Sequence, residues 1–171
     1  AIKHSGGTSA LTIDSSGNLT ANANLHYAGA VLQVQSSQVS AWSPTSSTSA
    51  IASGLSVTIT PKFNNSKVLV LVSMNGLYTQ AAGTYAVYHL YKGGSIVNFM
   101  SSVQGQNAGS GYEYGACLAH QYLDSPATTS ATTYEVYYLS AGTSGSVGFN
   151  NYAAGGNNTT HSTITAMEIA Q

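Results

Sequence analysis

The segment VLVLVSMNGLY, residues 68–78, decides the fold class of this chain. Its apolar side chains alternate with the period of two that a β-strand imposes. Valine and methionine occupy one face and leucine the other: Val68, Val70, Val72 and Met74, against Leu69, Leu71 and Leu77. A strand that is apolar on both faces must be covered on both. We therefore expect one face to pack on a second sheet and the other to be covered as well.

Similar short runs of Val, Ile, Leu and Tyr follow one another along the chain, with Gly, Ser, Asn and Pro between them. They show no helical period. The expected strands are residues 29–35, 55–60, 68–78, 85–92, 96–103, 115–123, 134–140, 147–152 and 163–170. The pair Gly93-Gly94 predicts a tight hairpin turn, because glycine readily adopts positive φ. Regularly spaced strands predict an all-β fold, a jelly-roll β-sandwich over residues 28–171.

The first 27 residues differ from this pattern. Residues 10–14 and 19–21 predict two short strands around a turn at Gly17-Asn18. A hairpin this small cannot bury much apolar surface alone. We therefore expect residues 1–27 to form a stalk or collar that associates with copies of itself on neighbouring chains and leads into the head.

Charged side chains are rare. Four Lys and five Asp or Glu make up 5% of the 171 residues, against roughly 25% in ordinary soluble domains. Four scattered lysines, with no arginine, cannot form the basic surface that nucleic acid requires. The longest apolar run, residues 68–72, is far shorter than the ~18 residues of a membrane helix. The composition therefore predicts neither nucleic-acid binding nor membrane insertion.

The last expected strand carries small or β-branched residues on both faces. Such a strand suits close approach to identical strands at a symmetry axis, with Ile164, Ala166 and Glu168 as the candidate axis residues. An ordinary central strand of a monomer would have the same composition. The strand alone does not decide between these two interpretations.

Five phrases of the sequence resemble the carboxy-terminal heads of bacteriophage tail fibres, especially those of marine and cyanobacterial phages. They are residues 9–20 (SALTIDSSGNLT), 54–61 (GLSVTITP), 66–72 (SKVLVLV), 122–136 (YLDSPATTSATTYEV) and 162–169 (STITAMEI). The resemblance implies a trimeric jelly roll of the tumour-necrosis-factor and C1q type, with a thin stalk and a host-facing tip. The family usually has an arginine beside the Gly-Gly turn, where this chain has HLYKGG at residues 89–94. That departure affects surface charge more than fold.

Such a head would belong to the virion and act outside the host cell. The partners that the resemblance implies are further copies of the chain in a homotrimer, a host cell-surface glycan or protein, and other tail-fibre or virion proteins on the N-terminal side.

The acidic residues do not predict an active site. Glycoside hydrolysis needs two carboxylates that flank the scissile bond, and the five acids are scattered over different expected strands and loops. Asp124 and Glu113 are the pair to consider, but we favour Asp124 as a cap of the turn before Pro126 and Glu113 as a solvated side chain. No Gly-x-Ser-x-Gly motif occurs. We therefore expect no enzymatic activity.

Metal and cysteine chemistry are equally weakly indicated. None of the five histidines forms a His-x-His or His-x-x-x-His pair. In a trimer, Glu168 or His161 near the threefold axis would supply three metal ligands, one from each copy. We favour the alternative that both are hydrogen-bonded polar side chains. The lone Cys117 lies in an apolar run and is expected to be small and buried. We predict no metal site, no cofactor and no intrachain disulfide.

Tyrosine is far more frequent than the other aromatic residues, with 12 Tyr beside three Phe and one Trp. Binding loops combine tyrosine with Ser, Gly and Asn, because its ring is rigid and its tip is polar. Residues 104–114 and 150–161 have this composition, and their candidate receptor-binding residues are Asn107, Tyr112, Tyr114, Tyr152, Asn157, Asn158 and His161. The alternative is that many tyrosines simply cover sheet faces, as expected for Tyr85, Tyr88, Tyr91, Tyr134, Tyr137 and Tyr138.

These observations favour a non-enzymatic tail-fibre head that attaches the virion to its host. A purely structural trimerisation or decoration domain and a surface-glycan hydrolase are the alternatives. If every strand crosses the domain, residues 61–66, 93–94, 124–132 and 153–161 lie at one end, and residues 79–84, 104–114 and 141–145 at the other. With both termini at the stalk end, the first group is expected to face the host.

Overall fold

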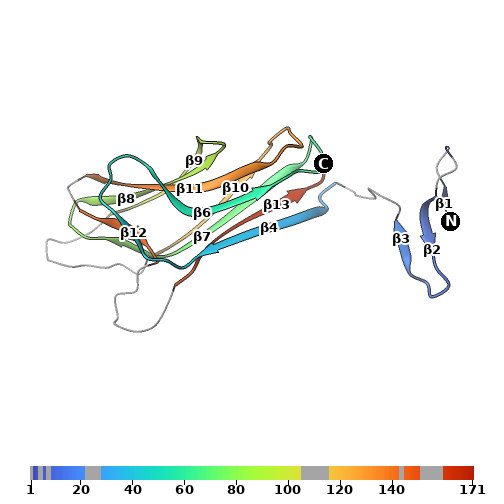
Figure 1. Cartoon of the computed structure of the whole chain (residues 1–171), viewed down its shortest axis with the longest axis horizontal. Coiled ribbons are helices and arrows are strands. Elements are labelled where there is room, and N and C mark those ends of the chain that lie inside the picture. Colours follow the sequence, from blue (N-terminus) through green and yellow to red (C-terminus); the bar gives the residue numbers. More distant parts are fainter. Residues whose placement is uncertain are drawn as a thin grey trace.

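The structure is a computed structural model that describes residues 2–3, 6, 9–21, 28–104, 116–142, 145–150 and 160–171. Every regular element in these residues is a β-strand, which confirms the all-β prediction (Figure 1). Within the same residues, no helix is long and apolar enough to cross a membrane.

The N-terminal part forms a small antiparallel sheet of its own, with strands β1 (Ile2–Lys3), β2 (Ser9–Ile13) and β3 (Leu19–Ala21). Asp14 shapes the turn between β2 and β3, because its Oδ1 accepts hydrogen bonds from the amides of Ser16 at 2.9 Å and Asn18 at 2.8 Å. These bonds, with that of the Asn18 side chain the largest contribution, hold the pKa of Asp14 below its ordinary value. Gly17 supplies the positive φ of 84° that the turn needs.

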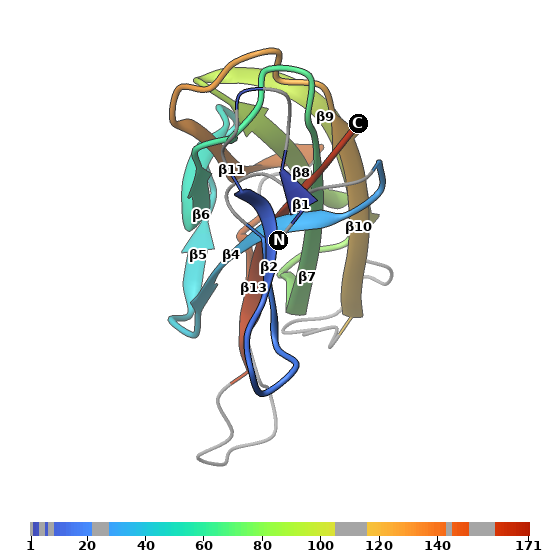
Figure 2. The same cartoon turned by 90° about the vertical axis from the view of Figure 1, so that its right-hand side faces the viewer.

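The remaining strands form two sheets. One has the order β4-β13-β7-β12-β5, with β10 on the free side of β7, and the other has the order β6-β11-β8-β9. The first contains β4 (Val31–Val39), β5 (Ser43–Thr45), β7 (Lys67–Thr79), β10 (Ala116–Asp124), β12 (Val147–Phe149) and β13 (Ser162–Ile169). The second contains β6 (Ile51–Ile59), β8 (Thr84–Lys92), β9 (Ser95–Gln104) and β11 (Thr132–Gly142). The two sheets pack face to face as a β-sandwich (Figures 1 and 2).

The strand order follows a regular rule. The long strands in chain order are β4, β6, β7, β8, β9, β10, β11 and β13. In one sheet the neighbours are β4, β13, β7 and β10, which are the first, eighth, third and sixth long strands of the chain. In the other sheet they are β6, β11, β8 and β9, which are the second, seventh, fourth and fifth. This order is consistent with a jelly roll, in which two Greek keys share one sandwich.

The core lies between the sheets and takes every second residue of each long strand. On β7 the inward residues are those of the valine face, while Leu69 and Leu71 stay half-exposed on the outer surface. The buried apolar cluster includes Leu55, Val57, Ile59, Val68, Val70, Val72, Met74, Leu90, Leu118, Val136, Ile164 and Ala166. The expectation that one face of residues 68–78 packs on a second sheet is therefore confirmed.

Three fully buried tyrosines cross the core and satisfy their hydroxyls on the far side. Tyr88 donates to the carbonyl of Gly148 at 2.8 Å, and Tyr138 donates to the carbonyl of Ser43 at 2.9 Å. Tyr134 donates to Oδ2 of Asp124 at 2.6 Å. Each bond joins a strand of the second sheet to a strand of the first, so the two layers are linked by polar contacts as well as by apolar packing.

The position of β12 corrects the assignment of loops to the two ends. Residues 147–152 were expected to form a crossing strand, but β12 has three residues and pairs with Tyr78 and Thr79, at the end of β7. Consequently β13 begins at the same end: the Asn75 side chain donates to the carbonyl of His161 at 2.5 Å. His161 was expected at the end that holds residues 61–66, and that expectation is wrong.

The start of β4 and the C-terminus of the chain lie together at the opposite end of the sandwich, which we call the C-terminal end (Figure 1). The amide of Gly29 donates to the carbonyl of Ala170, and the amide of Ala170 donates to that of Ala30, both at 2.9 Å. The turn at residues 61–66 and the Gly93-Gly94 turn lie at this end too, since the Glu168 carboxylate accepts from the amide of Lys62 and Gly93 pairs with Thr133. These two turns were predicted to lie at the end away from the chain termini, but they lie at the same end as the termini, so that prediction is wrong.

Core packing makes a direct prediction for two isoleucines of the sandwich. Ile164 is fully buried in the cluster, whereas Ile96 is 55% exposed. Ile164→Ala should lower the free energy of unfolding by about 2–5 kcal/mol, because a cavity remains. Ile96→Ala should cost no more than about 0.5 kcal/mol. Urea unfolding followed by fluorescence measures both, and equal losses would contradict the assignment of the core.

Candidate binding surfaces

Two acidic residues of the sandwich, Asp124 and Glu168, are engaged in structural contacts, and Glu113 lies outside the described residues. Asp124 is buried, with Oδ1 and Oδ2 at 3.0 and 2.8 Å from Nζ of Lys92, and it also accepts the Tyr134 hydroxyl. No hydrogen bond to the Pro126 turn accompanies these contacts, so the role expected for Asp124 as a turn cap is replaced by an ion pair between strands. Burial, followed by the hydrogen bond to Asp124, raises the pKa of Tyr134.

Glu168 is fully buried and serves as an anchor for the turn after β6. Its Oε1 accepts from the amide of Lys62 at 2.7 Å, from the amide of Phe63 at 3.3 Å and from the hydroxyl of Ser66 at 2.7 Å. Its Oε2 accepts from the side-chain amide of Gln33 at 2.6 Å. Burial raises the pKa of this carboxyl, but the four hydrogen bonds outweigh burial and hold the pKa below its ordinary value.

The three candidate axis residues all lie inside the single-chain sandwich. Ile164 and Ala166 belong to the core cluster, and Glu168 is bonded as described above. These side chains are therefore not free to meet a neighbouring copy. The residues that β13 leaves half-exposed are those of its other face, Thr163, Thr165 and Met167.

Most of the predicted receptor-binding residues lie outside the described residues: Asn107, Tyr112, Tyr114, Tyr152, Asn157 and Asn158. His161 is described and exposed, at the end of the sandwich opposite the C-terminal end. Asn150, at the start of the second predicted loop, is buried and structural. Its side-chain amide donates to the carbonyl of Val39 at 3.0 Å, and its carbonyl oxygen accepts from the hydroxyl of Ser162 at 2.8 Å.

No group of three or more His, Cys, Asp or Glu in the described part of the chain is arranged to hold a metal ion. Cys117 is exposed on the outer side of β10, which corrects the prediction of a buried thiol. The alternation of the strand explains the difference, because it is the next residue, Leu118, that points into the core.

The outer surface of the first sheet carries a continuous array without charge, which we call the uncharged face. The strand register aligns three rows across β10, β7, β13 and β4. The rows are Leu123, Leu69, Met167 and Val34; then Gln121, Leu71, Thr165 and Ser36; then Ala119, Ser73, Thr163 and Gln38. Leu123 and Val34 are 55% and 50% exposed. The alternation thus places Leu69 and Leu71 on this surface. Leu77 was expected on the same face but is buried in the core, because a register shift opposite residues 74–77 interrupts the alternation.

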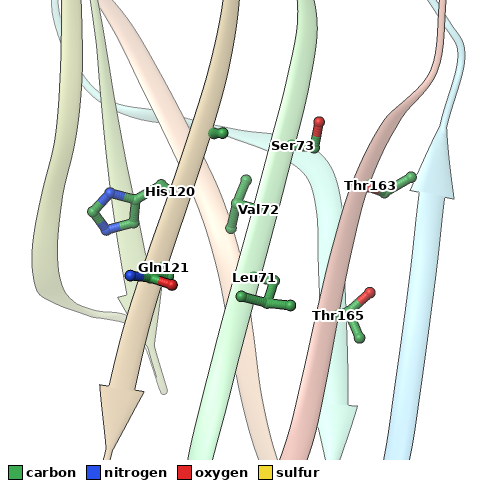
Figure 3. Close-up of a pocket in the computed structure, with 8 residues that line it drawn as sticks. Leu71, Val72, Ser73, His120, Gln121, Thr163 and Thr165 are labelled. Carbon is green, nitrogen blue, oxygen red and sulfur yellow. The ribbon is translucent and has the colours of Figure 1, made fainter.

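A shallow groove runs over the uncharged face between β10, β7 and β13 (Figure 3). Leu71 lies at its floor, with Gln121 on one side and Thr165 on the other. The polar side chains that line it are hydroxyls, the Gln121 amide and the His120 imidazole. Burial lowers the pKa of His120, which favours its neutral form, so the groove can accept apolar side chains and neutral hydrogen-bonding groups. It offers no charged group to fix an ionic ligand.

The outer surface of the second sheet carries a row of rings on β11, β8 and β9. Tyr137 and Tyr91 stack with ring centroids 4.1 Å apart, and His89 meets Tyr91 edge-on at 6.5 Å. Phe99 meets His89 edge-on at 5.7 Å. We call this surface, with Ile96 beside it, the aromatic face.

One carboxylate borders the aromatic face. Glu135 lies directly opposite Tyr91 in the register of β11 and β8, and its charge raises the pKa of Tyr137, to which it is hydrogen-bonded. Burial lowers the pKa of His89, which favours the neutral imidazole. Among the described residues, the aromatic face thus has one carboxylate at its border and contains no lysine or arginine.

The sequence shows the tyrosines of the aromatic face but not that they lie side by side, so it did not predict a site there. Tyr85, Tyr88, Tyr91, Tyr134, Tyr137 and Tyr138 were all attributed to sheet covering. Strand parity separates them, because Tyr88, Tyr134 and Tyr138 point into the core while Tyr85, Tyr91 and Tyr137 point outward. Pairing β8 with β11 is what places the outward rings side by side.

Comparison with known proteins adds no family assignment. No protein-family model matches the chain, and no curated protein matches it.

The buried Glu168 carboxylate makes the stability of the sandwich depend on pH. Because its pKa is lowered in the folded state, its contribution is present at neutral pH and is lost as the pH falls through that pKa. Glu168→Gln should lower the free energy of unfolding at pH 7 by about 1–3 kcal/mol. The difference between the two proteins should shrink as the pH falls below 4.5, the ordinary pKa of the group. Urea titrations at several pH values test this, and a constant difference down to pH 3 would contradict it.

Proposed function

We propose that the chain is the non-enzymatic head of a homotrimeric phage tail fibre, which attaches the virion to a glycan or protein on the host surface. The observation that carries the proposal is the uncharged face, together with the resemblance of the sequence to such heads. Large exposed apolar surfaces on soluble proteins mark interaction sites.

The uncharged face suits contact with copies of the same chain. Burying a charged side chain in an interface is costly unless it is paired, and none of the twelve side chains in the three rows is charged. The row of Leu123, Leu69, Met167 and Val34 offers the apolar area that self-association needs. The number of three copies comes from the resemblance alone.

The placement of the chain ends supports a head that is carried on a stalk. β4 starts beside Ala170 at the C-terminal end, so the preceding segment reaches the sandwich there. The opposite end, which includes the end of β7, β12 and His161, then points away from the stalk. Three identical heads on one fibre multiply a weak contact into firm attachment.

The uncharged face predicts how the assembly can be broken. A carboxylate at the groove floor, introduced by Leu71→Glu, should convert a trimer into monomers, since three buried charges would have no partners. Thr165→Glu, in the same row, should act in the same way. Ser102→Glu, exposed on β9 of the other sheet, is the matched control and should remain a trimer.

Size-exclusion chromatography with light scattering measures the mass of each protein, and circular dichroism checks that each is folded. A monomeric wild-type protein, or folded trimers of both row variants, would overturn the proposal for this face.

Attachment itself is tested with fluorescently labelled protein on a panel of bacterial and cyanobacterial cells, with and without their surface polysaccharide. We expect binding to at least one strain, and little change in binding between low and high salt, because so few charges are available. A trimer that binds no strain infected by the parent phage would indicate a purely structural role. Loss of polysaccharide during incubation would indicate a hydrolase.

A further inference from the structure

We propose that the aromatic face binds a neutral carbohydrate chain, with sugar rings stacked on Tyr91, Tyr137 and Phe99 and sugar hydroxyls donating to Glu135. This inference rests on the proposed function, since it names the ligand class and the surface through which the head would hold it. It is carried by the arrangement of exposed rings around one carboxylate.

The rings form a ready-made platform. The Tyr91–Tyr137 stack and the edge contacts of His89 hold four rings together over three hydrogen-bonded strands. A platform on strands is more rigid than one on loops, so little ordering is required on binding. Phe99 is 57% exposed, and Tyr91 and Tyr137 are half-exposed.

The apolar exposure on this face is unusually concentrated. Ile96, at 55% exposure, lies opposite Tyr91, and Phe99 lies opposite His89. Exposing these two large apolar side chains to water is unfavourable. A ligand that covers them therefore gains binding free energy. A pyranose ring does so with its C–H faces, which are apolar, while its hydroxyls point outward to polar neighbours.

Charge decides which carbohydrates fit. The strands β6, β8, β9 and β11 contain only two charged residues, Lys92 and Glu135. Lys92 is paired with Asp124, which leaves Glu135 as the charged group on the outer surface. A carboxylate repels sulfated or uronic acid sugars and accepts hydrogen bonds from neutral hydroxyls. The face therefore selects uncharged glycans.

A second copy of the chain fits this surface less well. Contact between copies would bury Glu135, and the chain offers few cations to pair with it. There is no arginine, and Lys92 is already in its ion pair. Lys62 and Lys67 donate to the carbonyl of Leu32 and the hydroxyl of Ser125. An unpaired buried carboxylate is strongly unfavourable. Sugar hydroxyls can instead donate hydrogen bonds to the carboxylate, and no cation is then required.

Affinity electrophoresis tests the inference on the whole protein. Native gels are cast with mannan, laminarin, dextran or galactan as neutral probes, and with alginate or dextran sulfate as acidic probes. We expect retardation by at least one neutral polysaccharide and by neither acidic one. Phe99→Ser and Tyr91→Ala should each weaken that retardation at least tenfold, and Glu135→Gln should weaken it less.

Trp42→Ala is the matched control, because Trp42 is an exposed ring, 43% accessible, that belongs to another part of the first sheet's surface and packs on Tyr78. It should bind like the wild type. The inference is overturned if no neutral probe retards the protein, if Phe99→Ser and Tyr91→Ala both bind as the wild type does, or if the acidic probes bind best. It is also overturned if the face variants change the oligomeric mass, which would make this surface a contact between copies.

The same variants separate this inference from the proposed function. If Phe99→Ser and Tyr91→Ala remain trimers and still attach to cells as the wild type does, attachment stands and the aromatic face is excluded as its site. If wild-type trimers attach to no cells, the proposed function fails whatever the gels show.

Discussion

The sandwich depends on the way its buried tyrosines end in hydrogen bonds. A core filled by Tyr88, Tyr134 and Tyr138 would be unstable if their hydroxyls were unpaired, since each unsatisfied buried group costs about 1–3 kcal/mol. Each hydroxyl instead finds a specific acceptor across the sandwich, on Gly148, Asp124 or Ser43. Two of these acceptors are backbone carbonyls of the short strands β12 and β5, so the tyrosines fix the far end of the sandwich as well as its thickness.

The distribution of polar contacts leaves the two outer surfaces with different characters. Asp124 and Lys92 pair between the sheets, and Glu168 is bonded within the sandwich at the C-terminal end. The first sheet is then free to expose hydroxyls and aliphatic side chains, and the second to expose rings around Glu135. Two carboxylates of the sandwich, those of Asp124 and Glu168, are thus buried and used in structural contacts, and the outer faces differ in ring content more than in charge.

Alternation in residues 68–78 was enough to predict a strand and a second sheet packed on one of its faces, but not that the valine face would be the inner one. Contacts between distant strands were not predictable, because nothing local marks them. Asp124 was assigned to its own turn, whereas its partner Lys92 is 32 residues away. β12 was expected to be longer, and its true length decides the end at which His161 lies. Tyr91 and Tyr137 were visible as tyrosines, but only the register of β8 and β11 brings them into contact.

The pairing of β4 with β13 has a mechanical consequence. The chain reaches β4 at the C-terminal end and runs along the whole sandwich beside β13, from Val31 opposite Ile169 to Val39 opposite Ser162. A pull applied through the preceding segment, while the opposite end is held, acts parallel to these strands. Their hydrogen bonds lie across the strands, so the load is in shear and is shared by the ladder as a whole. A sandwich loaded in this way would resist mechanical unfolding better than one whose first strand could be peeled away bond by bond.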